Sequence, residues 1–363
     1  MESQPAQPRK ALLLASPHMY QERLSIETAR TLLQQYGVDI TQIHSVETLD
    51  HQPPMGKYWR AEGIDVVIVA GGDGSVGAAA THLAYSGLPL GILPLGTSND
   101  FARSLRLPLD LADACQTIAT GHVISIDLGH ARPALTEPYA LHEEAAEAAV
   151  SSSGAFQREA FFTHALTLGL NVAFAQLATN ATMRQRFGPL TYPVAALETV
   201  AAAQPLDFTL SFHHPACALA PEASETEIEE QPYRYQALQV AVINSPIFGG
   251  QFAFSVAGVE LYDRLLDILI IERFDPRQLL AALQAALAPS ENGWREANSK
   301  NFPGIHHVQA GGVTISTDEP VDVTLDGEIR GRTPIEVTSA ARALNVIVPQ
   351  ASDALKDRGA AGG

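Results

Sequence analysis

An unbroken run of apolar residues, VVIVA at 66–70 within IDVVIVA at 64–70, leads directly into the glycine-rich turn GGDGSV at 71–76. A strand that is apolar at every position is typical of a parallel sheet covered by helices on both faces. The same order of strand, turn and helix recurs through the first third of the chain, with strands expected over 10–16, 38–46 and 88–96 and helices over 25–37, 77–85, 97–104 and 111–120. This repetition predicts an N-terminal doubly wound α/β domain.

The pattern changes near residue 124, after which short runs alternate between apolar and polar residues. Alternation with a period of two is typical of antiparallel strands that bury one face. We therefore expect a C-terminal antiparallel β-sandwich with one or two helices inserted around 171–203. The predicted boundaries are 10–124 for the α/β domain, 125–350 for the β-sandwich, and 351–363 for a disordered tail.

The charge balance limits which partners we expect. Asp and Glu number 40 against 23 Lys and Arg, which gives a formal net charge of −17. Nucleic acid is an unexpected partner because phosphate binding needs clustered cations, and tight electrostatic adsorption to anionic membranes is disfavoured as well. No window approaches the roughly 20 uninterrupted apolar residues of a transmembrane segment. We expect a cytoplasmic protein that associates with membranes only transiently.

The turn at 71–77 places Asp73 between two glycines, and three interpretations are open: a purely structural turn, a dinucleotide site of the G-x-G-x-x-G type, and an ATP site. The dinucleotide site fits poorly, because the turn does not open the first strand–helix unit and the next strand ends in the neutral sequence PLGTSN. A carboxylate beside phosphate is useful if Mg²⁺ stands between them, or if it accepts a proton from the attacking hydroxyl. The sequence therefore favours ATP, although no P-loop motif is present.

Two motifs, GGDGS at 71–75 and PLGTSNDFAR at 94–103, carry a family resemblance. Together they resemble the bacterial diacylglycerol-kinase-like lipid kinases, which share a catalytic domain with sphingosine and ceramide kinases. The first motif also occurs in phosphofructokinases and NAD kinases, whereas the second is much more specific. The resemblance continues through FGPLTY at 187–192, NSPIFGGQFAF at 244–254, LYDRLLDILII at 261–271 and LDGEIRGRTPIEV at 325–337.

This resemblance implies acid–base residues and an ATP site. The catalytic residues it indicates are Asp73, Asp326 and Glu328, of which Glu328 stands where the family has its proton acceptor. A lipid hydroxyl is a poor nucleophile until a base removes its proton, so a carboxylate suits this position. Without the resemblance, the D-G pair at 326–327 would indicate an ordinary hairpin turn. The implied ATP-binding residues are Gly71, Gly72, Asp73, Gly74, Ser75, Val76, Gly77 and Thr97.

The resemblance also implies a structural Mg²⁺ ion, which bacterial members bind through one carboxylate and two backbone carbonyls. The matching positions are Asp263 for the carboxylate, with Glu260 and Leu265 for the carbonyls. Arg264 replaces a glycine of the family motif, and an Asp263–Arg264 ion pair is the alternative to the metal.

Two further departures concern the ATP site. Ser16 begins the segment that replaces the family's N-P-x-S-G, and Gly77 with Ala78 replaces an Asn-Glu pair on the helix after the glycine turn. Small residues cannot make the contacts of an Asn and a Glu. A degenerate, non-catalytic homologue that binds a nucleotide or a lipid is therefore one alternative.

The resemblance thus predicts a two-domain lipid kinase that uses ATP and Mg²⁺ to phosphorylate a hydroxyl of a membrane-derived lipid such as diacylglycerol. A soluble-substrate kinase of the NAD kinase or phosphofructokinase kind is the second alternative. The expected partner is the lipid substrate at the membrane surface, and a homodimer is compatible with the sequence. Ile247 and Phe248, which precede the flexible Gly249–Gly250 pair, are candidates for a gate through which the lipid enters.

Overall fold

The computed structural model of the protein describes residues 9–16, 23–49, 52–134, 159–170, 204–215, 232–248, 254–255, 258–272 and 304–350. The predicted inserted helices at 171–203, the FGPLTY motif and the predicted tail at 351–363 lie outside these residues.

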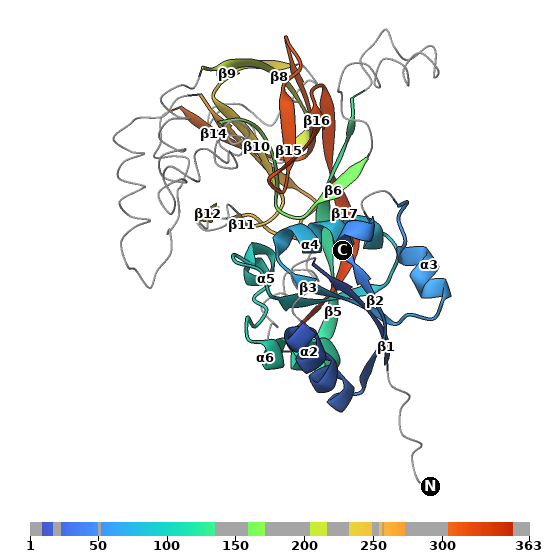
Figure 1. The fold of residues 1–363 in the computed structure, drawn as a ribbon. Coiled ribbons are helices and arrows are strands. Elements are labelled where there is room, and N and C mark those ends of the chain that lie inside the picture. Colours follow the sequence, from blue (N-terminus) through green and yellow to red (C-terminus); the bar gives the residue numbers. More distant parts are fainter. Residues whose placement is uncertain are drawn as a thin grey trace, which may run out of the picture.

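The N-terminal part is an α/β domain, which occupies the lower half of Figure 1. Its parallel strands lie in the order β2 (Val38–Ser45), β1 (Arg9–Ala15), β3 (Val66–Gly71) and β4 (Pro89–Pro94). The helices between and after them are α2 (Arg23–Gln35), the short 3₁₀ helix η1 (Val46–Leu49), α3 (Gly56–Ala61), α4 (Asp73–Leu83), α5 (Asp100–Ser104) and α6 (Leu111–Thr120).

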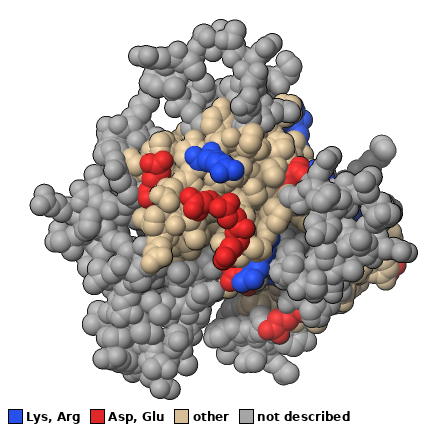
Figure 2. Space-filling view, turned by 90° about the horizontal axis from the view of Figure 1, so that it is seen from above, with Lys and Arg blue, Asp and Glu red and all other residues tan. Residues whose placement is uncertain are grey.

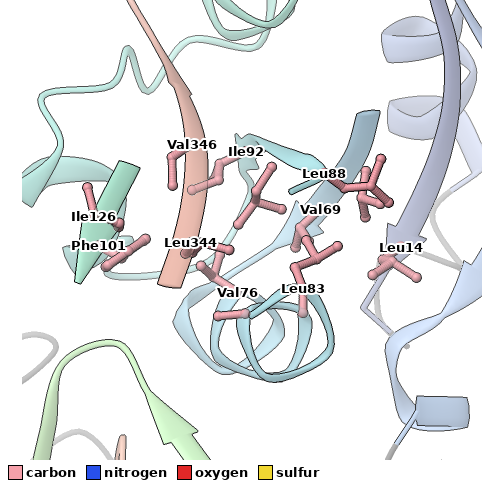
Figure 3. Packing of buried hydrophobic residues seen from close by; sticks show 14 of the residues in the cluster. Leu14, Val69, Val76, Leu83, Leu88, Ile92, Phe101, Ile126, Leu344 and Val346 are labelled. Atoms are coloured by element: carbon pink, nitrogen blue, oxygen red, sulfur yellow. The ribbon is translucent and has the colours of Figure 1, made fainter. Parts of the chain in front are cut away.

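The strands of this domain are buried on both faces because successive side chains point to opposite sides of the sheet. Leu13 of β1 packs into the core beneath α2 and α6, whereas its neighbour Leu14 packs into the core beneath α4. Figure 3 shows the second core, where Val76 and Leu83 of α4 lie against side chains of the sheet such as Val69. Packing along the sheet holds α4 with its first residue directly after the end of β3.

The last strand joins the two halves of the molecule. One end of β17 (Ile335–Val348) pairs with β14 (Ile305–Thr317), and near its other end Val346 pairs in parallel with Leu90 of β4. The antiparallel strand β5 (His122–Pro133) accompanies β17 along most of its length, and both run between the domains in Figure 1. The side chains of Leu344 and Val346 belong to the core around α4. Residues 344–348, assigned to the second domain from sequence alone, thus complete the sheet of the first.

The C-terminal part is built from antiparallel strands around a separate apolar core. The path from its edge to β17 is β16, β15, β7, β10, β13 and β14, with β8 and β9 added beyond β14. The bounds of the remaining strands are β6 (Ala160–Phe162), β7 (Ala165–Gly169), β8 (Leu206–Pro215), β9 (Tyr233–Ala237), β10 (Gln239–Ile243), β11 (Ile247–Phe248), β12 (Phe254–Ser255), β13 (Leu266–Ile271), β15 (Asp322–Leu325) and β16 (Glu328–Arg332).

The predicted fold class, an α/β domain followed by a β-sandwich, is confirmed, and two local features differ from expectation. Helix α4 begins at Asp73 instead of residue 77, because the carbonyl of Gly72 already accepts hydrogen bonds from the N–H groups of Ser75 and Val76. The unpredicted helix α3 follows the proline-rich turn and is anchored by the buried indole of Trp59. Among the described residues, no helix combines the length and the apolar character needed to cross a bilayer.

Candidate active site

The GGDG and PLGT turns lie against each other at the ends of β3 and β4. A Cβ atom added to Gly96 would approach the Cα of Gly72 to 2.3 Å, and one added to Gly72 would lie 3.1 Å from the Cα of Gly96. Glycine is therefore required at 96, because any side chain would overlap with backbone. The contact brings the two motifs that carry the family resemblance into one surface.

Asn99 holds the PLGT turn in shape. This residue adopts the left-handed conformation, with φ of 54°. Its Nδ2 donates hydrogen bonds to the carbonyls of Pro94 and Gly96, and its Oδ1 accepts one from the N–H of Gly96 at 2.9 Å. The side chain is buried, so Asn99 fixes the turn from within, whereas Thr97 is exposed on the same turn.

Asp73 is the first residue of α4, and its side chain is a quarter exposed, at 25%. Its Oδ1 accepts a hydrogen bond of 3.0 Å from the N–H of Phe101, which is part of α5 after the PLGT turn. Burial acts to raise the pKa of Asp73, but contacts with His164 and with the N–H groups of Phe101 and Asp100 outweigh burial and lower the pKa from its ordinary value of 3.8. Asp73 is thus an oriented, ionised carboxylate at the edge of the two turns.

Asp326 lies in the turn between β15 and β16, and its carboxylate is surrounded by donors. Oδ1 accepts from the N–H groups of His164 and Ala165, and Oδ2 accepts from the N–H and the hydroxyl of Thr163, all at 2.8–3.1 Å. Burial acts to raise the pKa of Asp326, but the contact with His164 and these donors lower it. A carboxylate that is only 13% exposed and accepts this many hydrogen bonds anchors the hairpin. The predicted acid–base role of Asp326 stays a prediction, and the contacts show that this carboxylate also holds the turn in place.

His164 joins these two carboxylates. Its Nε2 lies 3.3 Å from Asp73 Oδ1, and its Nδ1 lies 3.6 Å from Asp326 Oδ1. The Nε2 contact is an ion pair without the alignment of a hydrogen bond. Burial alone would lower the pKa of His164, but the contacts with Asp326 and Asp73 outweigh it and raise the pKa from 6.5 to about 10. The ring is therefore a cation at neutral pH.

Glu328, the predicted proton acceptor, has a different environment from Asp326. It is the first residue of β16, its side chain is 63% exposed, and it forms an ion pair with Arg330 at 2.5 Å. An exposed pair of this kind contributes little to stability and opens readily. The carboxylate of Glu328 is therefore far more exposed to solvent than the carboxylate of Asp326, at 63% against 13%.

The second domain also contacts α5 through the segment before the Gly249–Gly250 pair. The hydroxyl of Ser245 donates to the hydroxyl of Ser104 at 2.7 Å, and the N–H of Ile247 donates to the same oxygen at 3.3 Å. The backbone of Phe248 pairs with Phe254 in the β11–β12 ladder. The proposed gate segment therefore starts at a contact between the two domains.

Gly77, one of the departures from the family motif, faces this same cluster. A Cβ atom at this position would lie 3.1 Å from Asp326 Oδ2 and 3.9 Å from Thr163 Oγ1. The absence of a side chain lets α4 approach the Asp326 turn closely. Glycine in place of the family's larger residue at position 77 thus allows α4 to pack tightly on the second domain.

The predicted metal site is a loop before β13. The Oδ1 of Asp263 accepts the N–H of Leu265 at 2.9 Å, while the N–H of Arg264 donates to Asp127 Oδ2 at 2.7 Å. Burial raises the pKa of Asp263 to about 6, and Asp267, Asp127 and Glu260 add to this effect. The ion pairs found within the described ranges include none between Asp263 and Arg264. Nor do those ranges contain three or more His, Cys, Asp or Glu side chains arranged around a metal position.

The structure thus brings Asp73, Asp326 and the two glycine turns together, with Glu328 two residues beyond Asp326, and among the described residues no hydrogen bond or ion pair joins the Asp263 side chain to them. Sequence reasoning missed His164, Thr163 and Asn99. For His164 no signal was available, because a single histidine in the strand-like run FTHALTLG has no ligand or motif spacing. Asn99 was recognised only as part of a polar run at a helix start.

Comparison with known families assigns both halves of the chain. Residues 14–131 match the family described as "Diacylglycerol kinase catalytic domain", and residues 165–348 match "YegS C-terminal NAD kinase beta sandwich-like domain". The chain belongs to the diacylglycerol-kinase-like family. The first match includes both glycine turns, and the second includes the Asp326 hairpin. The second match begins at Ala165, one residue after His164.

Individual relatives of this family are distant. An uncharacterized protein of Synechocystis is 26% identical over 79% of this chain, and the chain spans only 56% of that protein. A diacylglycerol kinase of Staphylococcus saprophyticus is 22% identical over 78% of this chain and 77% of its own length.

Solved structures show the same fold. A Bacillus anthracis protein superposes with a TM-score of 0.65 at 21% identity, covering 97% of this chain and 99% of that one. A second structure from that organism, described as a diacylglycerol kinase, gives 0.57 at 19% identity over 94% and 98% of the two chains. At the level of the family, then, the chain is a lipid-kinase homologue.

Proposed function

We propose that the protein is an ATP-dependent lipid kinase that transfers the γ-phosphate to a hydroxyl of a membrane-derived lipid such as diacylglycerol. The observation that carries this proposal is the contact between the GGDG and PLGT turns, with the ionised carboxylate of Asp73 at their edge. Family membership supports kinase chemistry in general. The use of ATP as the phosphate donor and of a lipid hydroxyl as the acceptor is what we propose beyond family membership.

The glycine turns suit a triphosphate. Asp73 stands between Gly72 and Gly74 at the start of α4, so its two neighbours at this helix end carry no side chain. A helix N-terminus and exposed N–H groups attract phosphate oxygens. We assign ATP, as its Mg²⁺ complex, to the surface formed by 71–77 and Thr97.

Glu328 is the proposed base for the acceptor hydroxyl. It belongs to the hairpin that Asp326 anchors beside His164, so the hairpin position depends on the same cluster that orients Asp73. Its exposed carboxylate can take a proton as the phosphoryl group transfers. In this proposal Asp326 holds the hairpin in place, and Glu328 accepts the proton of the acceptor hydroxyl.

The Asp263 loop suits a structural Mg²⁺ ion. A half-buried carboxylate with a raised pKa, close to Asp127, Asp267 and Glu260, is an all-oxygen environment with excess negative charge. Hard divalent cations prefer such oxygen donors. Asp263 with the carbonyls of Glu260 and Leu265 would hold the ion, which would neutralise the loop and keep it folded.

Access to lipid must come mainly from apolar contact, since the net charge of −17 opposes adsorption to anionic bilayers. The described part of the face in Figure 2 carries acidic and basic side chains close together, so it presents mixed charge. Ile247 and Phe248 at the domain contact remain the proposed lipid gate.

Incubation of the purified protein with γ-labelled ATP and a mixed lipid extract, followed by thin-layer separation, tests this function. Label in a phosphorylated lipid is the expected result. Parallel incubations with NAD and with soluble sugars address the alternative substrates, and NAD is included because the second domain matches an NAD-kinase-like sandwich. Label in NAD or sugar alone would overturn the lipid assignment, and no label in any acceptor would favour a non-catalytic protein.

A further inference from the structure

The Asp73–His164–Asp326 cluster joins three elements that are far apart in sequence. Asp73 comes from α4 of the α/β domain, His164 lies between β6 and β7, and Asp326 lies in the β15–β16 turn. The ring of Phe101 packs edge-on against His164 with centroids 5.7 Å apart. Each contact therefore crosses from one element to another, and the contact with Asp73 crosses between domains.

One hydrogen bond and one ion-pair contact indicate where the protons of the ring lie. Asp326 Oδ2 can only accept, so the Thr163 hydroxyl donates to it at 2.9 Å. The Thr163 oxygen is then free to accept from His164 Nδ1 at 2.8 Å, which requires a proton on Nδ1. On the other side, Nε2 faces the acceptor-only Oδ1 of Asp73 at 3.3 Å. Both ring nitrogens thus face acceptors, which is the pattern of an imidazolium.

The turn that carries His164 is itself held in place. Asn244 is buried, donates from Nδ2 to the carbonyl of Thr163 at 3.0 Å, and donates from its own N–H to the carbonyl of His164 at 2.8 Å. The side chain of His164 is only 7% exposed. Such a ring cannot reach substrate, but it has a fixed position from which to hold Asp73.

We propose that His164 is a positioning residue that orients the Asp73 carboxylate for phosphoryl transfer and ties its position to the hairpin of Asp326 and Glu328. This inference rests on the proposed kinase function. The ring acts through Asp73 and exchanges no proton with substrate. A shift of the carboxylate by 1 Å would suffice to slow transfer by roughly a hundredfold.

Two substitutions separate the two sides of the ring. In His164→Gln the terminal amide nitrogen lies near the Nε2 position and can still donate to Asp73. In His164→Asn the amide nitrogen lies near the Nδ1 position and can donate to Thr163 but not to Asp73. Positioning predicts that His164→Asn lowers kcat roughly ten- to a hundredfold with KM for ATP and for lipid changed less than about threefold, and that His164→Gln recovers a clear part of kcat.

The matched control is His307→Asn. His307 also pairs with a buried aspartate, Asp267, at 2.6 Å, and no contact joins it to Asp73 or Asp326 in the described residues. This variant should lose stability without a change in kcat per folded molecule. Equal kcat in His164→Asn and His164→Gln, or a fall that only follows the folded fraction, would overturn the positioning role.

Nuclear magnetic resonance of protein labelled with ¹⁵N-histidine tests the same inference without activity. Both nitrogens of His164 should show protonated shifts at pH 7.5, and this pattern should be lost in Asp73→Asn or Asp326→Asn. A neutral ring at pH 7.5 in the wild-type protein would overturn the inference even if kinase activity is found. Failure of the wild type to phosphorylate any lipid would instead overturn the proposed function.

Discussion

Two groups of partly buried acidic residues in this molecule differ in what compensates their negative charge. Asp73 and Asp326 face a protein cation, His164, and the pKa values of both carboxylates lie below 3.8. In the loop before β13, burial and neighbouring carboxylates raise the pKa of Asp263 to about 6. A carboxylate removed from water needs compensation from a cation or from donors. The first group is balanced within the chain, and the second is arranged to gain from an added cation.

The largest effect should come from breaking the balanced group at the less exposed of its two carboxylates, Asp326. Asp326→Asn replaces an acceptor oxygen by an amide that faces N–H donors, and it leaves His164 with one partner fewer. Loss of one partner of a buried pair costs about 3–5 kcal/mol. We expect a loss of that size in urea unfolding at pH 7.5. The exposed Asp318→Asn in the nearby turn is the control and should change stability by less than about 0.5 kcal/mol.

A smaller loss is expected at the buried carboxylate next to the Asp263 loop. Asp127 accepts the N–H of Arg264 at 2.7 Å and the N–H of Arg342 at 2.6 Å, one on each oxygen. Asp127→Asn leaves one of these N–H groups facing a donor, which costs about 1–3 kcal/mol. The same unfolding measurement checks it. If Asp127→Asn lowers the free energy of unfolding as much as Asp326→Asn does, then the ion pairs of His164 add no stability to the first group.

In the absence of ATP, Mg²⁺ should act on the second group alone. If Asp263 and the carbonyls of Glu260 and Leu265 hold the ion, the melting temperature of the wild type rises with millimolar Mg²⁺, because a ligand that binds only the folded state stabilises it. Asp263→Ala should abolish this rise, and Asp318→Asn should keep it. A wild-type melting temperature that does not respond to Mg²⁺ would contradict a metal in this loop.

The smallest effect is a gain in stability. The folded-state pKa of Asp263 is raised, so its contribution is full below 3.8 and is lost as pH rises through about 6. Asp263→Asn without metal should therefore raise the melting temperature at pH 8 and not at pH 3.5. We expect no more than about 4 °C, because solvent screens a half-exposed side chain. A gain that is equal at both pH values would point to packing instead of charge.

Much of the fold follows from local patterns in the sequence. The apolar run 66–70 predicts β3, and the period-two alternation predicts the second domain. The crossing of β17 into the first sheet was not predictable, because the pairing of Val346 with Leu90 leaves no trace in either segment. Motifs located Asp73 and Asp326 but could not show that the carboxylate of Asp326 accepts hydrogen bonds from Thr163, His164 and Ala165. The role of His164 could not be predicted, because it depends entirely on contacts with residues that are distant in the sequence.

The most direct test of the account is the rate of lipid phosphorylation by Asp73→Asn. Asparagine keeps the size of the side chain and an oxygen for the N–H of Phe101, but it loses the charge beside the glycine turns. Transfer from labelled ATP, divided by the folded fraction at the assay temperature, should fall by roughly a hundredfold or more. Turnover close to that of the wild type would contradict the assignment of Asp73 and the two glycine turns as the catalytic site.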